Sequence, residues 1–228
     1  MSDEVRISAV GDSALIVELS TRHEADADVN ARAVELAAAV QLAAIAGVLD
    51  VVPTFQTVGV HFDPLITDAD LLSQCLRRVM APQAPTSTAA RVVHRIPVSY
   101  GGTLGPDLAE VAKAAKLSEQ AVVSLHAAPL YRVFMLGFTP GFAYLGSVEP
   151  AIALPRRATP RATVPAGSVG IAGRQTGIYP SASPGGWHII GRTPIRPFDP
   201  ERAEPFLFNP GDCVQFYPIE PAALGRRT

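Results

Sequence analysis

The first 80 residues alternate short apolar runs with longer stretches that have helical periodicity. Strand-like runs at Val5–Val10 and Ala14–Leu19 are separated by a turn signal at Gly11. From Ala25 to Ala46, apolar residues recur at helical spacing, and Gly47 ends the run. This order of elements predicts a β-β-α unit.

The same order of elements follows a second time. Runs at Val48–Phe55 and Val58–Phe62 form the next strand pair, and a helix extends to about Val79. Thr67 and Asp70 have capping-box spacing, which predicts Thr67 as the N-cap of this helix. Two β-β-α units predict a small α+β domain over residues 1–80, with both helices on one face of an antiparallel sheet.

The second half of the chain has a different pattern. Residues 81–90 are rich in Pro, Ser and Thr without apolar periodicity, which is typical of a linker. A strand at Val92–Tyr100, helices starting near Pro106 and Ser118, and a strand at Tyr131–Leu136 follow. From residue 137 on, short apolar runs alternate with Gly and Pro turns. This predicts a β-barrel or closed sandwich, with a second domain over residues 91–228.

Composition indicates an ordinary globular protein. Of the 228 residues, 48% are hydrophobic and 18% charged, and the net charge of −2 argues against a nucleic-acid partner. Cys75 and Cys213 are far apart and have no metal-ligand spacing, so we expect no metal site and no required disulfide. The N-terminus lacks the pattern of a signal peptide, and no apolar run is long enough to span a bilayer. We expect a cytoplasmic protein without a membrane partner.

Arginines without acidic neighbours mark one stretch of the chain. From Ala151 to Phe198 there are six arginines and no Asp or Glu, and the prolines between them limit the freedom of the backbone. Guanidinium groups without local acidic partners suit an anionic ligand. The alternative is that they cap carbonyls or pair with acids elsewhere in the chain. The candidate anion ligands are Arg156, Arg157, Arg161, Arg174 and Arg192.

Glycines in VPAGSVGIAGRQTGIYP offer a second set of polar groups. Backbone amides and hydroxyls there could contact an anion, so Ser168, Gln175, Thr176 and Tyr179 are further binding candidates. The phosphate-binding motif GxxxxGK[ST] is absent. A barrel rim also needs glycine for its bends, which explains the same pattern without a ligand.

Trp187, the single tryptophan, lies in the strand-like run at Trp187–Ile190. A tryptophan in a strand is most often part of the core or barrel lining, although it could also stack on a planar ligand. By strand alternation, His188 should face the opposite side, toward solvent.

Two residues are candidates for acid–base chemistry. His126 precedes Ala-Ala-Pro at a predicted helix C-terminus, where the helix dipole supports a protonated imidazole. A lone histidine is more often a capping or core residue than a catalyst. Asp107 follows Gly-Pro at a helix start, where its carboxylate either belongs to the first turn or faces a cleft. No arrangement of nucleophile, histidine and acid is recognisable.

Several long motifs carry a family resemblance. YGGTLGPDLAEVA, GFTPGFAYLG, LPRRATPRATVPAGSVGIAG, QTGIYPSASPGGW and IGRTP resemble the B subunit of bacterial 5-oxoprolinase, a family also called KipI or allophanate hydrolase subunit 1. The N-terminal GDSALIVEL and VVPTFQTVGVHFDP are similar to its first domain, so the resemblance covers nearly the whole chain. It implies a small α+β domain followed by a cyclophilin-like β-barrel.

The resemblance also implies a function and partners. The implied activity is ATP-dependent opening of 5-oxo-L-proline to L-glutamate, performed with the A and C subunits of 5-oxoprolinase, with Mg²⁺ accompanying ATP. Under this hypothesis Arg157, Arg161 and Arg174 stabilise charge on the transferring phosphoryl group. Two other functions of the family stay open: carboxyl transfer similar to that of urea amidolyase, and inhibition of a sensor histidine kinase by the barrel acting as a binding module.

Overall fold

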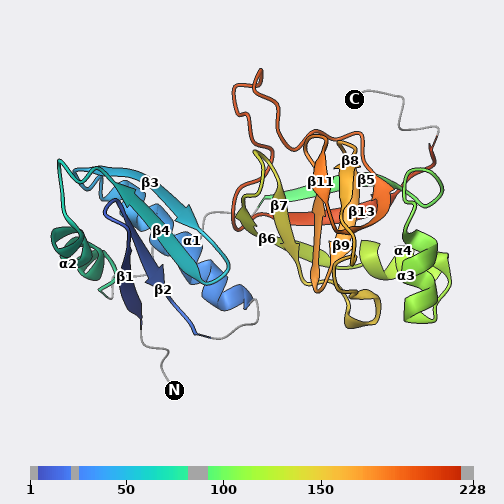
Figure 1. Cartoon of the computed structure of the whole chain (residues 1–228), viewed down its shortest axis with the longest axis horizontal. Coiled ribbons are helices and arrows are strands. Elements are labelled where there is room, and N and C mark those ends of the chain that lie inside the picture. Colours follow the sequence, from blue (N-terminus) through green and yellow to red (C-terminus); the bar gives the residue numbers. More distant parts are fainter. Residues whose placement is uncertain (1–4, 22–25, 82–91, 222–228) are drawn as a thin grey trace. The chain divides into compact units, whose positions relative to one another are not determined.

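The computed structural model of the chain describes residues 5–21, 26–81 and 92–221. The chain divides into two compact units, residues 1–90 and 91–228, and each is described by itself (Figure 1). Most of the predicted linker at residues 81–90 lies outside the described residues.

The N-terminal unit contains an antiparallel sheet with the strand order β1-β2-β4-β3 (Figure 1). Hairpins join β1 to β2 and β3 to β4, and the pairing of β2 with β4 connects the two halves of the sheet. The strands are β1 (Arg6–Val10), β2 (Ala14–Glu18), β3 (Val48–Pro53) and β4 (Thr57–Phe62).

Two helices, α1 (Ala27–Leu42) and α2 (Ala69–Val79), pack on this sheet and on each other, and bury an apolar core with it. The second helix begins one residue later than its predicted capping box. Its N-cap is Asp68, whose carboxylate accepts the Leu71 N–H at 2.8 Å, so the prediction of Thr67 was wrong. A carboxylate at this position also interacts favourably with the helix dipole.

The C-terminal unit is built around a closed barrel with the strand order β10-β7-β6-β13-β5-β12-β9. Its pairs are antiparallel except for β5 and β13, which lie parallel. A ribbon of β8 and β11 lies outside the barrel sheet. The strands are β5 (Val93–Tyr100), β6 (Leu130–Leu136), β7 (Ala143–Gly146), β8 (Arg161–Val164), β9 (Ser168–Ala172), β10 (Gln175–Ile178), β11 (Ser183–Gly185), β12 (His188–Arg192) and β13 (Cys213–Pro218).

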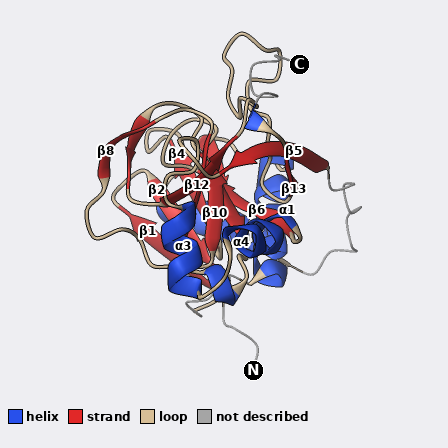
Figure 2. Cartoon of the chain, turned by 90° about the vertical axis from the view of Figure 1, so that its right-hand side faces the viewer, coloured by secondary structure: helices blue, strands red, loops and turns tan. Residues whose placement is uncertain are grey.

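Two short helices, α3 (Leu108–Ala115) and α4 (Glu119–Ala127), lie side by side against the barrel (Figure 2). α3 packs on β12, α4 packs on β13, and both contact the 3-10 turn η1 (Pro150–Ile152). The core of this unit combines inward-facing barrel residues with the apolar faces of these helices. The predicted α+β class with a C-terminal barrel is confirmed.

Candidate functional site

His126 lies inside the barrel unit, at the end of α4, with no exposed surface. Its Nδ1 is 2.8 Å from the Tyr100 hydroxyl, and its Nε2 is 2.8 Å from Oγ1 of Thr176. The Thr176 hydroxyl donates to the Gly170 carbonyl at 2.9 Å, so it accepts a hydrogen bond from Nε2–H. Nδ1 then accepts from the Tyr100 O–H. Each polar atom of this group has a partner, which fixes one tautomer of the imidazole.

Burial decides the charge of these groups. Desolvation lowers the pKa of His126 to about 3 and raises the pKa of Tyr100 well above its ordinary value. The prediction of a protonated imidazole was therefore wrong, because the helix dipole is weaker than the cost of burying a charge. The neutral ring stacks on Phe216, with a centroid distance of 4.7 Å, and ties α4 to β5 and β10.

Asp107, at the start of α3, is the centre of an ion-pair group and only 3% exposed. Arg161 binds both of its carboxylate oxygens, with distances of 2.7 and 2.9 Å. Arg157 contacts the same carboxylate at 3.0 Å and Glu110 at 2.9 Å. The Ile189 N–H of β12 also donates to Asp107, at 2.6 Å. We name Asp107, Glu110, Arg157 and Arg161 the Asp107 cluster.

Two of the predicted anion ligands, Arg157 and Arg161, pair with carboxylates of the Asp107 cluster. Arg157 and Arg161 lack acidic neighbours in sequence, yet the fold brings them to acids about fifty positions earlier. The bond to Asp107 raises the pKa of Arg161. Both charges are thus matched within the chain, and the cluster holds the segment around residues 157–161 against α3 and β12.

The other predicted binding residues are dispersed over the barrel. Nε of Arg174 donates to the Val148 carbonyl, and Nε of Arg192 donates to the Ala166 carbonyl, each within 2.9 Å. Ser168 and Thr176 are buried on β9 and β10, and Gln175 is half-buried on β10.

His188 is not exposed as predicted. Its side chain is buried, and its Nε2 lies 3.0 Å from the Pro155 carbonyl. Strand alternation predicts only that His188 and Trp187 face opposite sides. The prediction of exposure failed because the loop before β8, which includes Pro155, covers the side that His188 faces. Trp187 is also buried, in the aromatic group described next.

Aromatic side chains from separate segments enclose a small cavity of about 170 Å³. Phe142, a buried lining residue, connects the rings: it makes edge-to-face contacts with Phe138, Tyr144, Tyr179 and Trp187, at centroid distances between 4.9 and 5.6 Å. We name this cavity the aromatic pocket. Its lining residues are Phe138, Phe142, Tyr144, Arg156, Tyr179, Pro184, Gly185, Gly186 and Trp187.

The aromatic pocket contains one charged side chain, Arg156. It is exposed, and among the described residues its guanidinium forms no hydrogen bond or ion pair. Burial raises the pKa of the Tyr179 hydroxyl, whereas the Trp187 backbone N–H and the charge of Arg156 act in the opposite direction. The charge of Arg156 therefore acts on the polar end of the pocket.

Sequence reasoning missed the rings that form most of this pocket. Phe142 and Tyr144 lie two residues apart at the start of β7, and Phe138 precedes them in GFTPGF. This aromatic spacing was a usable signal. The sequence could not show that Tyr179 and Trp187, more than thirty residues later, complete the same enclosure.

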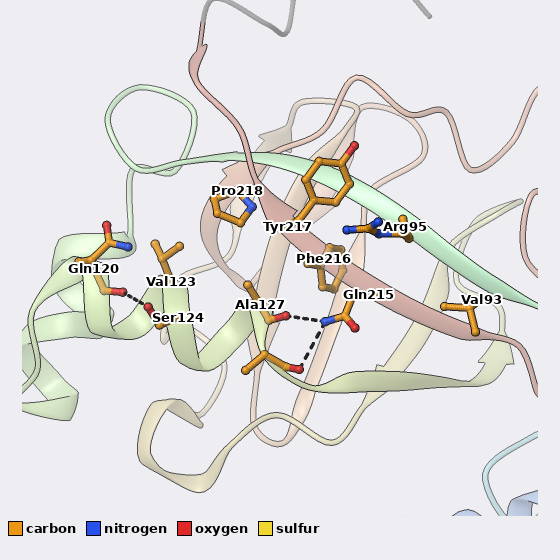
Figure 3. Close-up of a pocket in the computed structure, with 11 residues that line it drawn as sticks. Val93, Arg95, Gln120, Val123, Ser124, Ala127, Gln215, Phe216, Tyr217 and Pro218 are labelled. Atoms are coloured by element: carbon orange, nitrogen blue, oxygen red, sulfur yellow. Dashed lines mark hydrogen bonds between the residues drawn. The ribbon is translucent and has the colours of Figure 1, made fainter.

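Two other hollows are larger and more open. The first, of about 810 Å³, contains Arg192 and Arg196 and is formed by the segments around residues 166–167, 180–182 and 192–198. We name it the Arg192 cleft. The second, of about 490 Å³, is a groove between α4 and the β5–β13 pair, shown in Figure 3. There the Gln215 amide donates to the Ala127 carbonyl at 2.7 Å, and none of the predicted site residues lines the groove.

Neither a metal centre nor a membrane span is found in the part of the chain that the structure describes. No group of three or more His, Cys, Asp or Glu side chains is arranged there to bind a metal ion. No described helix combines the length and apolarity needed to cross a bilayer.

Similarity to known proteins identifies the family. Residues 5–208 match the family model described as the carboxyltransferase domain, subdomain C and D. The B subunit of 5-oxoprolinase from Bacillus subtilis is 37% identical over 229 residues, which cover 96% of this chain and 95% of the relative. The chain belongs to the family of 5-oxoprolinase B subunits. The relative of the same name from Escherichia coli O157:H7 is 59% identical over 54% of this chain and 56% of its own.

A solved structure is similar in both sequence and fold. The crystal structure of TTHA0988 is 42% identical and superimposes with a TM-score of 0.81. The match covers 92% of the chain described here but only 40% of TTHA0988. A region similar to this chain thus occurs within a much longer polypeptide.

Proposed function

We propose that this protein is the B subunit of an ATP-dependent 5-oxoprolinase, acting with the A and C subunits to open 5-oxo-L-proline to L-glutamate. The observation that carries the proposal is the 37% identity to a B subunit of 5-oxoprolinase over nearly the full length of both chains. Membership of a family of lettered subunits supports a complex of several chains, and the greater length of TTHA0988 supports a physical association with a further polypeptide.

The chemistry of the substrate explains why such an enzyme needs ATP. The lactam amide is a poor electrophile, and phosphorylation of its oxygen would create a good leaving group. The protein would then have to bind the carboxylate of the substrate and stabilise charge on the phosphoryl group. Both tasks need cationic side chains that are not already paired.

The contacts favour a positioning role for Arg157 and Arg161. Their guanidinium groups are engaged by Asp107 and Glu110, so they can hold neighbouring residues without leaving the Asp107 cluster. Their predicted contact with phosphate, and that of Arg174, stays a prediction. So does a direct catalytic role of His126 or Asp107.

The Arg192 cleft has the size and charge to receive the phosphates of ATP. Its volume of about 810 Å³ lies in the range of small-molecule sites, and Arg196 has no side-chain hydrogen bond or ion pair among the described residues. The aromatic pocket, at about 170 Å³, is too small for a nucleotide. If ATP binds this chain, Arg192 and Arg196 would contact its phosphates, and Mg²⁺ would arrive with the nucleotide.

Reconstitution tests the proposed function. The purified A, B and C subunits are combined, each is omitted in turn, and ATP hydrolysis is measured with and without 5-oxo-L-proline. We expect turnover that depends on 5-oxo-L-proline and is lost when the present chain is omitted. Equal turnover in its absence would contradict the proposal.

The matching family model favours one alternative, because its description names a carboxyltransferase domain. Carboxyl transfer would require a separate biotinylated partner. Biotin-dependent turnover of the assembled complex would support this second function, and inhibition of activity by avidin would detect it. Inhibition of a sensor histidine kinase stays a prediction, to be tested by binding to the kinase dimerisation domain.

A further inference from the structure

We propose that the aromatic pocket is the binding site for 5-oxo-L-proline, with the lactam ring between the aromatic walls and the substrate carboxylate on Arg156. This inference rests on the proposed function and names the place where that function binds its small substrate.

The size and walls of the pocket fit a small flat ring. A volume of about 170 Å³ is below the usual range of drug-sized sites and leaves room for one compact metabolite. Phe142 and Trp187 stand nearly perpendicular to each other, with an interplanar angle of 84°. Both rings are nearly buried and pack on each other, so a bound five-membered ring contacts only their pocket-facing surface and also covers the exposed Phe138.

The charge at the pocket selects an anion. Arg156 is available because no described residue pairs with it, whereas its neighbour Arg157 is bound to the Asp107 cluster. An aromatic enclosure alone would also suit a cation, but the guanidinium repels one. A carboxylate accepts two parallel hydrogen bonds from a guanidinium, which fixes the orientation of the ligand.

The segment that presents Arg156 is held from both sides. The Arg157 N–H donates to the Gly186 carbonyl at 2.8 Å, which ties this segment to the glycine wall of the pocket. The Arg157 guanidinium anchors it to Asp107. Arg156 therefore extends from a fixed backbone, and less conformational entropy is lost when it binds a ligand.

Two backbone features shape the wall of the pocket. Phe138 has φ of +66°, a strained conformation for a bulky residue, and the residue is 60% exposed at the pocket. Gly185 lies so close to Tyr179 that a Cβ there would overlap the tyrosine ring and hydroxyl. An aromatic side chain held exposed at a cost in backbone energy is typical of a site that closes over a ligand.

Trp187 provides a direct test, because it is the single tryptophan of the chain and lies in the pocket wall. The full-length protein, alone and mixed with the C subunit of 5-oxoprolinase, is titrated with 5-oxo-L-proline. Trp187 fluorescence is followed for the chain alone, and calorimetry is used for the mixture. We expect a saturable signal with 5-oxo-L-proline, and at least about tenfold weaker binding of 2-pyrrolidinone, which keeps the lactam and lacks the carboxylate.

Two variants at the pocket sharpen the test. Arg156→Gln should weaken binding of 5-oxo-L-proline at least about tenfold and reduce its preference over 2-pyrrolidinone. Phe138→Ala should weaken binding of both ligands, because it removes a wall and leaves the charge. The control is Arg78→Gln, which removes an exposed arginine from α2 in the other unit and should leave binding unchanged. Absence of binding in both preparations, or equal binding by Arg156→Gln, would overturn the inference.

Kinetics of the reconstituted complex separate this inference from the proposed function. In the Arg156→Gln complex we expect KM for 5-oxo-L-proline to rise at least about tenfold while KM for ATP stays unchanged. Normal KM in a complex that turns over would refute the pocket assignment and uphold the function. Specific binding at the pocket in a complex without turnover would uphold the pocket assignment and refute the proposed function.

Discussion

Arg156 and Arg157 are adjacent in sequence and have opposite environments. Arg157 extends into the Asp107 cluster, where two carboxylates match its charge. Arg156 lies at the aromatic pocket without a described partner. The first region is nearly buried around Asp107, and its charges are satisfied within the chain. The second combines exposed aromatic surface and an unpaired charge, which a ligand could cover and pair, with a strained backbone at Phe138.

The difference shows which polar groups hold the fold and which remain available. Buried polar groups need partners, and both Asp107 and His126 have a full set of them. A group whose partners all come from the same chain contributes to stability. Arg156 has no such partner among the described residues. Substitutions in the Asp107 cluster should therefore change stability, and a substitution of Arg156 should change ligand binding.

The largest effect expected from a substitution at neutral pH comes from removing the charge at the centre of the Asp107 cluster. Asp107→Asn leaves two partly buried guanidinium groups without their main partner, which should destabilise the barrel unit by about 3 kcal/mol. Urea unfolding followed by Trp187 fluorescence measures this. The matched control is Glu110→Gln at an exposed member of the cluster, for which we expect a loss below about 1 kcal/mol. Equal losses would show that Asp107 is not the centre.

His126 predicts a dependence of stability on pH. In the unfolded chain its pKa returns to about 6.5, whereas burial lowers it to about 3 in the folded protein. The unfolded state therefore binds the proton first. The contribution of the neutral ring is complete above about pH 6.5 and decreases by about 1.4 kcal/mol per pH unit below it, until about pH 3.

Unfolding curves of the wild type and His126→Gln, measured between pH 7 and 4, isolate this contribution. The wild-type curve should fall more steeply than that of the variant over this range. Parallel curves would show that His126 contacts solvent and is not a buried residue whose hydrogen bonds are all made within the chain.

The two adjacent arginines should give complementary results. Arg157→Gln should cost about 1 kcal/mol of stability, because Arg157 is itself partly exposed and Arg161 still pairs with the buried Asp107. The variant should retain most of the affinity for 5-oxo-L-proline. Arg156→Gln should change stability by less than about 0.5 kcal/mol and lose most of the affinity. Thermal unfolding and ligand titration of both variants test this. A larger loss of stability in Arg156→Gln, or a larger loss of affinity in Arg157→Gln, would contradict the assigned roles.

The smallest expected effect concerns the strained residue of the pocket. Phe138→Asn places a residue that tolerates positive φ where φ is +66°, so the unfolding free energy should rise by up to about 1 kcal/mol. Binding of 5-oxo-L-proline should weaken at the same time. A variant that is less stable and still binds normally would assign Phe138 to packing rather than to the ligand.

Much of the fold could be predicted because its signals are local. The turn at Gly11 depends on a few neighbouring residues. So does the helix N-cap at Ser118, whose hydroxyl accepts the Ala121 N–H at 3.1 Å. The Thr67 cap failed by one position, and His188 failed because a later loop covers its face. Neither error changed the order of the elements.

The candidate site was only partly predictable because its contacts are long-range. The arginine-rich stretch supplies residues to the Asp107 cluster, the aromatic pocket and the Arg192 cleft, but the absence of acids in sequence did not mean their absence in space. Asp107 is fifty residues from Arg157 and was predicted separately as a catalytic candidate. No periodicity connects the two, since the closure of the barrel brings α3 to the segment before β8.

The sequence by itself determined the elements up to residue 136, the family and the presence of six arginines in an acid-free stretch, because these depend on local spacing and on long motifs. Tertiary structure alone decided which arginines are paired, why His126 is neutral, and which five rings enclose one cavity. The physical reason is that charge and burial depend on which distant segments pack together. A pattern along the chain fixes which side chains are present, and only the closed barrel fixes what each of them faces.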